Sequence, residues 1–258
     1  MRLLRRAQYA AAGGSYDTDA QAFFTATGIS DTTIKDAVDA LVVGLKADSV
    51  WTKFAAIYPL VGGTSSTHLV NLKNPGTHNI TWNGSVTHNS NGITSDGSTG
   101  YGNTNWNIST HGANNDEHMS VYLRTDADDA TRVYGASSGG SGTLMRKNGG
   151  NYATKCQETT ERTNAVSNSL GYFSVNRTAS TGYRGRQNTT NFNITSTSEA
   201  RVNLNVYLSC LNSGGTAVNF TTRNIAWFAI GTGLTQTEDG NVQSRVETFQ
   251  DALSRGVV

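Results

Sequence analysis

The chain has 258 residues, of which 36% are hydrophobic and 15% are charged. Its formal net charge of +1 excludes recruitment to nucleic acid by bulk charge. Low charge together with four Trp, ten Tyr and eight Phe excludes a disordered chain. No stretch approaches the ~18 apolar residues of a membrane span, and the start lacks the apolar core of a secretory signal. We therefore expect neither a span nor a signal peptide.

The first six residues combine basic and apolar side chains. Arg2, Arg5 and Arg6 carry donors suited to acidic partner surfaces, and Leu3 and Leu4 lie between them. We expect this arm to act in assembly, on a neighbouring subunit or against the chain's own helices. A solvated arm is the plain alternative, and contact with nucleic acid is not favoured.

Two helices are predicted next, as a hairpin. The first is capped by Asp17 or Thr18 and ends before Gly28. The second is capped by Ser30 or Asp31. Its apolar residues recur at helical spacing: Ile34, Val38, Leu41, Val42 and Leu45. The aromatic segment 51–58 is interpreted as a wedge that fastens this hairpin to the following domain.

From residue 63 the pattern changes to short alternating segments rich in Asn, Thr, Ser and Gly, which predict strands. Segment 202–209 alternates most clearly, and segment 222–231 is apolar on both faces, as in a covered central strand. Five turn signals separate the segments: Asn83-Gly84, Asn91-Gly92, Asp96-Gly97, Asn148-Gly149 and Ser213-Gly214-Gly215. A capping box, Thr235 to Glu238, opens a last helix.

These patterns predict a mainly β protein, a concanavalin A-like or jelly-roll sandwich with helical ends. Residues 1–62 form the arm and hairpin, 63–232 the sandwich, and 233–258 a helix that packs on the preceding elements.

Catalytic signals are weak. A glycoside hydrolase needs two carboxylates ~5–9 Å apart on one site, whereas Asp116 and Glu117 are adjacent and point to opposite faces of a strand. We expect no enzyme activity. Cys156 and Cys210 are either buried small residues or a disulfide.

One acidic cluster could hold a metal. Asp126, Asp128 and Asp129 offer oxygen ligands for Ca²⁺ within a predicted loop. No closing bidentate Glu follows at a fixed spacing, so a solvated turn is the favoured interpretation.

Sugar binding requires an exposed aromatic face beside amides. Trp106 lies between asparagines, including Asn103 and Asn105, and is the best candidate for an exposed ring, with core packing as the alternative. Tyr183 is a further candidate. Two other tryptophans are interpreted as core residues: Trp82 and Trp227.

Several segments resemble a family of tailed-phage and prophage virion proteins that carry a concanavalin A-like (laminin-G-like) domain. The similar segments are residues 51–63, 68–73, 96–101, 227–234 and 249–255. The resemblance implies a virion location and a structural role, as a head-decoration, fibre or tail-appendage subunit. It implies a homo-oligomer docked non-covalently on other virion proteins. The alternative is a receptor-recognition protein that binds a host-surface glycan, and a glycan depolymerase is less favoured.

Overall fold

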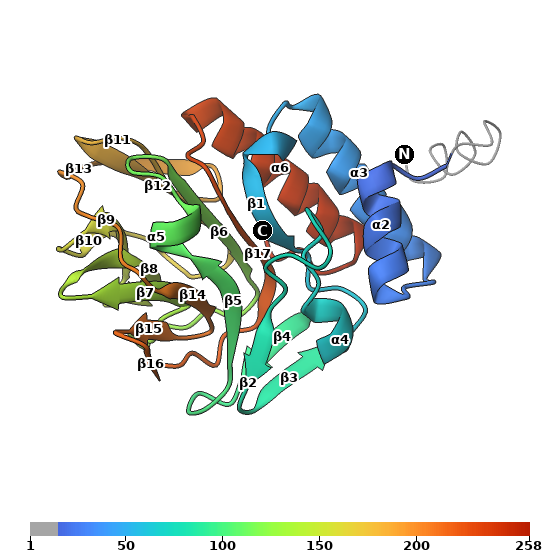
Figure 1. Cartoon of the computed structure of the whole chain (residues 1–258), viewed down its shortest axis with the longest axis horizontal. Helices are drawn as coiled ribbons and strands as arrows, with labels where there is room; N and C mark the ends of the chain where they lie inside the picture. The colour runs from blue at the N-terminus through green and yellow to red at the C-terminus, as the bar shows by residue number, and fades with distance from the viewer. Residues whose placement is uncertain (1–14) are drawn as a thin grey trace.

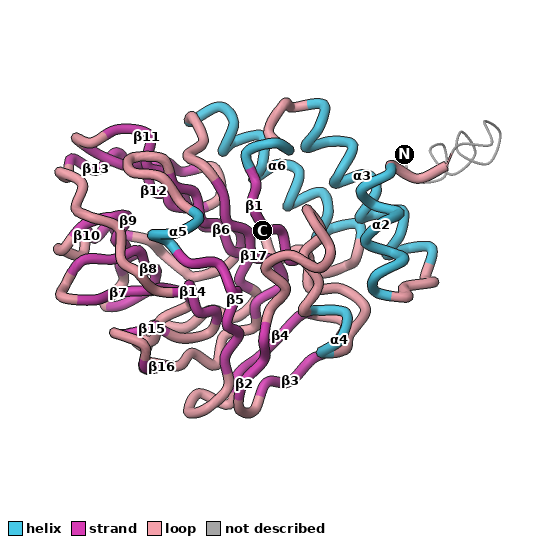
Figure 2. Tube along the Cα trace, in the orientation of Figure 1, coloured by secondary structure: helices cyan, strands magenta, loops and turns pink. Residues whose placement is uncertain are grey.

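The computed structural model of the chain describes residues 15–258. The predicted assembly residues Arg2, Leu3, Leu4, Arg5 and Arg6 lie outside this range. Two mainly antiparallel sheets pack face to face, and helices cover the outer face of one of them (Figure 1). Figure 2 shows most of the helical residues gathered on that side. The predicted β-sandwich with N-terminal helices and a C-terminal helix is therefore confirmed.

The sheet under the helices has eight strands within the described residues, in the order β13-β12-β11-β6-β17-β4-β3, with β1 added beside β17. The central strand β17 is buried along its whole length, as its apolar sequence predicts. The bounds are β1 Phe54–Tyr58, β3 Val86–Asn89, β4 Gly92–Ser95, β6 Glu117–Leu123, β11 Gly171–Ala179, β12 Gly182–Gln187, β13 Thr190–Thr195 and β17 Ile225–Gly231.

The second sheet has nine strands in the same part of the chain, in the order β10-β9-β8-β7-β14-β5-β2, with the β15–β16 hairpin beside β7. Predicted glycine turns join three of the hairpins: β3–β4, β8–β9 and β15–β16. The bounds are β2 Thr81–Asn83, β5 Tyr101–Asn107, β7 Tyr134–Ser138, β8 Ser141–Asn148, β9 Asn151–Glu158, β10 Arg162–Ala165, β14 Asn205–Leu208, β15 Leu211–Ser213 and β16 Thr216–Val218.

Part of segment 51–58 differs from the expected wedge. After the short 3-10 helix η1 (Trp51–Lys53), strand β1 pairs with β17 and extends the first sheet. Its side chains still reach the helices, because Phe54 and Ile57 belong to the apolar core under the helical layer. One strand thus joins the helical hairpin to the sheet through both backbone pairing and side-chain packing.

The helices begin and end where the sequence predicts. Asp17 caps α2 (Thr18–Thr27), Gly28 ends it in the left-handed conformation, and Asp31 caps α3 (Thr32–Ala47). The Thr235–Glu238 capping box opens α6 (Gln236–Ala252). Two single-turn helices lie in loops, α4 (Ser65–His68) and α5 (Ile108–His111). No helix of residues 15–258 combines the length and apolarity needed to cross a membrane.

The structure has two apolar cores. One lies between the sheets and includes Val206, Phe228 and the free thiol of Cys156. Cys210 is also buried and free, so the two cysteines form no disulfide. The other core lies between the first sheet and helices α2, α3 and α6.

A buried ion pair fixes α6 on the first sheet. Asp239 of α6 is 0% exposed, and its carboxylate accepts a hydrogen bond of 2.7 Å from Arg186 of β12. The same carboxylate accepts hydrogen bonds from Tyr172 at 3.0 Å and Ser174 at 2.8 Å, both on β11. These bonds satisfy a charge that would otherwise be costly to bury. At the other side of the helix, Arg245 pairs with Asp48 at 2.7 Å, next to α3.

We predict that Asp239→Asn lowers the free energy of unfolding by about 3–5 kcal/mol, because it leaves the Arg186 guanidinium buried without a counter-charge. Thermal and urea unfolding of the variant measure this loss. Asp251→Asn, at an exposed position on the same helix, is the matched control and should behave like the wild type. Equal stability of Asp239→Asn and the control would contradict the anchoring role.

A buried carboxyl between the sheets is expected to make the stability of the fold depend on pH. Glu117 is 0% exposed, and burial raises the pKa of its carboxyl. The folded state therefore holds this proton more tightly than the unfolded state, and stability falls as pH rises above the unfolded pKa. We predict that Glu117→Gln raises the melting temperature at pH 8 and that the difference disappears at pH 3. The exposed Glu199→Gln is the control, and an unchanged melting temperature at pH 8 would contradict the prediction.

Candidate ligand-binding face

The outer surface of β5 and β14 lies on the side of the sandwich opposite the helical layer (Figure 1). On β5, Gly102, Thr104 and Trp106 are buried, while the residues between them are half-buried or exposed. Strand β14 shows the same alternation and pairs Tyr207 with Asn103. The outward residues form what we call the amide–tyrosine face: Tyr101, Asn103, Asn105, Asn107, Asn205 and Tyr207.

Asparagine side chains brace one another on this face. The Asn103 side-chain oxygen accepts hydrogen bonds from Asn205 Nδ2 at 3.1 Å and from the backbone N–H of Asn105 at 2.9 Å. Asn105 lies at an irregularity in the β5–β14 register with φ of 55°, a conformation that Asn tolerates. Its Nδ2 donates to the Asn79 carbonyl at 2.8 Å and to Thr81 at 3.0 Å. The face is therefore held in one arrangement before any ligand binds.

Polar atoms remain available beside these bonds. Asn103 Nδ2, Asn105 Oδ1 and Asn205 Oδ1 make no hydrogen bond to any residue in 15–258. Two acceptors and one donor group thus stand at one surface, an arrangement that suits sugar hydroxyls, since each hydroxyl both donates and accepts.

Two tyrosines supply the apolar part of the face. The rings of Tyr101 and Tyr207 lie 4.6 Å apart at an interplanar angle of 32°, and Phe220 lies 6.2 Å from Tyr101. All three side chains are half-buried. Burial raises the pKa of the Tyr207 hydroxyl, which keeps it a neutral donor at physiological pH. Neither tyrosine stands out as a site residue in the sequence, although each lies two residues from an outward Asn on its own strand.

Trp106, the best candidate for an exposed ring, is buried, and so is the further sugar-binding candidate Tyr183. Trp106 is 2% exposed because its position on β5 faces the core between the sheets. Tyr183 is 3% exposed, and its hydroxyl donates to the Thr154 carbonyl at 3.1 Å. Neither ring can receive a ligand at the surface. Of the two tryptophans assigned to the core, Trp227 is fully buried, and Trp82 is half-buried with Nε1 bonded to the Ser65 carbonyl.

The acidic cluster is used by the protein's own cations. Asp129 pairs with the buried Arg223 at 2.8 Å. Asp126 and Asp128 lie 3.6 and 3.9 Å from Lys147 Nζ. The described part of the chain holds no group of three acidic, His or Cys residues placed to bind a metal. These carboxylates balance internal positive charge, and the structure gives a Ca²⁺ site no support.

The side chains of the adjacent residues Asp116 and Glu117 point in different directions, as expected. Asp116 accepts a hydrogen bond of 2.6 Å from the Gly233 amide, whereas Glu117 is turned into the core and accepts one of 3.0 Å from Gln157. The pair cannot act together on one glycosidic bond.

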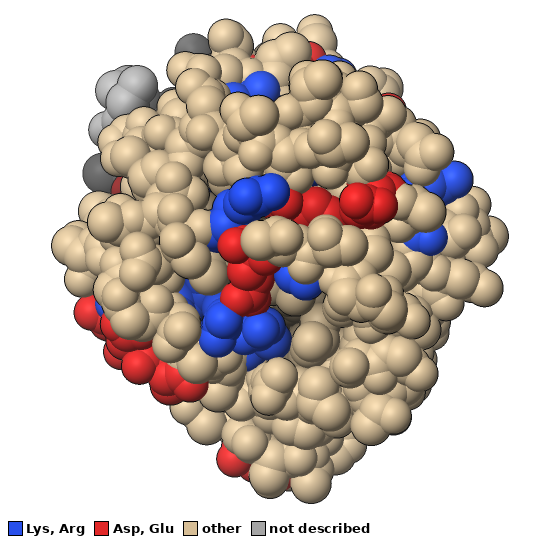
Figure 3. Space-filling view, turned by 90° about the vertical axis from the view of Figure 1, so that its left-hand side faces the viewer, with Lys and Arg blue, Asp and Glu red and all other residues tan. Residues whose placement is uncertain are grey.

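Charged side chains elsewhere pair locally. Figure 3 shows the end of the sandwich remote from the helices, where most of the surface is uncharged and opposite charges lie next to one another. Glu161, for example, pairs with Arg132 at 2.9 Å and with Arg146.

A groove of about 560 Å³ lies at the other end of the molecule. It is lined by the turn between α2 and α3, by Gly62 and Gly63, and by Leu253 and Ser254 after α6. Nothing in the structure indicates what would fill it.

No family model and no curated protein matches this sequence. Among solved structures, the binding domain of botulinum neurotoxin serotype D is similar, with a TM-score of 0.54 and 12% identity over 76% of this chain and 52% of that chain. The receptor binding domain of the C/D mosaic serotype gives 0.53 and 12% over 75% and 51%. Domain 4 of AbnA, an arabinanase of Geobacillus stearothermophilus solved with arabinotriose, gives 0.47 and 14% over 74% and 98%.

This chain thus spans about half the length of the toxin domains that it matches. At such identity the likeness establishes the fold alone: the protein is similar to β-sandwich domains that serve binding in other proteins.

Proposed function

We propose that the protein is a non-enzymatic glycan-binding module and that the amide–tyrosine face is its binding surface. The observation that carries this proposal is the paired Tyr101 and Tyr207 rings beside amide atoms that make no hydrogen bond within residues 15–258. Sugar rings present C–H faces that pack on aromatic rings and hydroxyls that bond to amides. The fold likeness to domains named for receptor binding adds support at the level of architecture.

The separation of Asp116 and Glu117 supports binding without cleavage. Glu117 is buried, and Asp116 is engaged by the backbone of Gly233. The expected outcome for the wild-type protein is sugar binding with no release of reducing ends.

The phage resemblance supports a second proposal, that the module belongs to a virion. Most of the similar segments contact one another on the helical side of the molecule. Strand β1 pairs with β17, and Arg255 after α6 donates to the Leu60 carbonyl at 2.9 Å. A helical side docked on the particle would leave the amide–tyrosine face outward. Immunogold labelling of purified particles tests this location, and labelling confined to host material would reject it.

The test of glycan binding is an array screen followed by calorimetric titration of the best neutral oligosaccharide. We predict that Tyr207→Ala and Asn103→Ala each weaken binding about tenfold, or roughly 1.4 kcal/mol. Asn193→Ala, an exposed Asn on β13 of the other sheet, is the matched control. Circular dichroism establishes that each variant is folded. Full affinity in both face variants would reject the assigned surface, and an array without any bound glycan would reject the function.

A further inference from the structure

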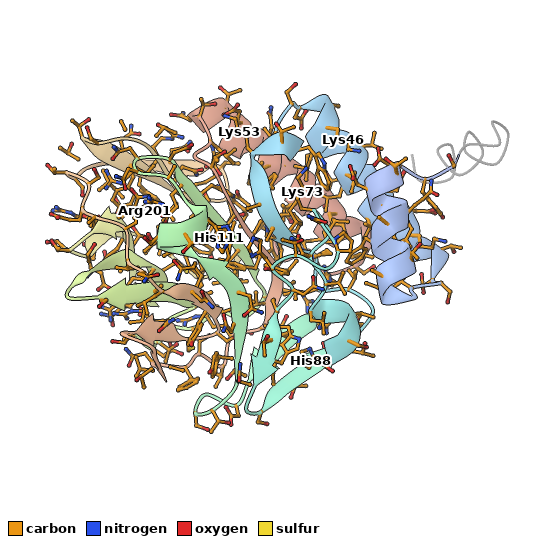
Figure 4. The ribbon with its side chains drawn as sticks, in the orientation of Figure 1. Lys46, Lys53, Lys73, His88, His111 and Arg201 are labelled. Atoms are coloured by element: carbon orange, nitrogen blue, oxygen red, sulfur yellow. The ribbon has the colours of Figure 1, made fainter. Side chains whose placement is uncertain are left out.

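One end of the amide–tyrosine face carries a cluster of basic side chains. His111 ends α5, His78 precedes β2, and their ring centroids lie 4.5 Å apart. Arg201 precedes β14, and its guanidinium reaches α5, beside which Figure 4 labels both Arg201 and His111. We call His78, His111 and Arg201 the basic end.

Hydrogen bonds to β5 fix which nitrogen of each imidazole carries a proton. His78 Nδ1 lies 3.0 Å from the Asn105 carbonyl, which can only accept, so Nδ1 carries the hydrogen. His111 Nδ1 lies 3.0 Å from the Asn107 amide, which can only donate, so the neutral ring carries its hydrogen on Nε2. His111 is exposed. Its Nε2–H makes no hydrogen bond to residues 15–258 and remains free to donate to a ligand.

Arg201 is held by backbone oxygens rather than by a carboxylate. Its Nη1 donates to the Ser109 carbonyl at 2.7 Å and also to the Gly112 carbonyl, while Nε donates to Asn114 at 2.9 Å. Within the described residues, Nη2 makes no hydrogen bond and no Asp or Glu lies within ion-pair distance of the guanidinium. The positive charge is thus fixed in position but not neutralised, unlike those of Arg146, Arg186 and Arg223.

Such a site favours an anion. His111 Nε2 on α5 and Arg201 Nη2 beside the same turn are two free N–H donors, and charge-assisted bonds to a carboxylate are roughly twice as strong as neutral ones. The Arg201 charge acts on the carboxyl of Glu117, but Glu117 is buried between the sheets and cannot occupy the surface. The neutral face next to the turn would meet the uncharged rings of the same ligand.

We propose that the basic end binds the carboxylate of an acidic glycan whose neutral sugars lie on the amide–tyrosine face. This inference rests on the proposed glycan-binding function and names its ligand class. Sulfated or phosphorylated glycans offer a related charge, and a preference for them is an outcome that the test distinguishes.

The test compares matched probes that differ only in the acidic group. Wild-type protein is titrated at low salt with sialyllactose and lactose, and with oligogalacturonate and its carboxyl-reduced product. The expected result is at least tenfold tighter binding of one acidic probe than of its neutral partner. Arg201→Gln and His111→Ala should remove this preference by lowering the affinity for the acidic probe. Arg162→Gln, on edge strand β10 of the same sheet, should retain it.

The possible outcomes separate the two proposals. Equal affinity for acidic and neutral probes would overturn the carboxylate site and leave glycan binding intact, as would a preference for sulfated over carboxylated glycans. Binding of neither probe class, with an array that also binds nothing, would overturn both. Arg201 braces the α5 turn, so a melting curve accompanies its variant; if Arg201→Gln is unfolded, the exposed His111→Ala decides the outcome.

Discussion

The buried carboxylate of Asp239 is the point on which the arrangement of the layers depends. A charge with no solvent contact must be fully paired, and only one placement of α6 brings Asp239 to Arg186, Tyr172 and Ser174 together. The bonds continue across the sheet, because Ser174 accepts from Asn176, whose own oxygen lies 2.8 Å from His118 Nδ1. Apolar packing alone would let the helix slide, whereas this network fixes its position.

Fixing α6 decides which surface of the sandwich remains open. The helices cover the outer face of the first sheet, so its strands can be apolar on both sides, as β17 is. Within residues 15–258, the outer face of β5 and β14 receives no such layer and is polar. Asparagine is a poor strand former, and here hydrogen bonds among Asn103, Asn105 and Asn205 take the place of packing. In the proposed function, the asparagines that weaken these strands are the residues that bind the ligand.

Local signals in the sequence predicted much of the fold. Caps at Asp31 and Thr235 and the glycine turns act within a few residues, and strand alternation at 202–209 identified an outward polar side. Strand β1 was missed because its apolar residues serve two layers and so show no alternation. Trp106 was misplaced because composition around it suggested exposure, while its position on β5 faces inward.

Contacts between residues far apart in the sequence cannot be predicted from local sequence patterns. The rings of Tyr101 and Tyr207 pack together although the residues are 106 positions apart in the sequence (207 − 101). Arg201 bonds to Ser109 of α5, which lies 92 positions away in the sequence. The buried arginines Arg177 and Arg255 find their partners mainly among backbone carbonyls, which carry no residue-specific signal in the sequence. The candidate site therefore emerged only when the strand order was known.

Hydrogen–deuterium exchange of the wild-type protein, with and without saturating oligogalacturonate or the best ligand of the glycan array, tests the account most directly. The account predicts slower exchange in β5, β14 and α5, with α3 and α6 unchanged, because the ligand lies on the uncovered sheet. Protection confined to the groove beside the α2–α3 turn, with β5 and β14 unaffected, would contradict it.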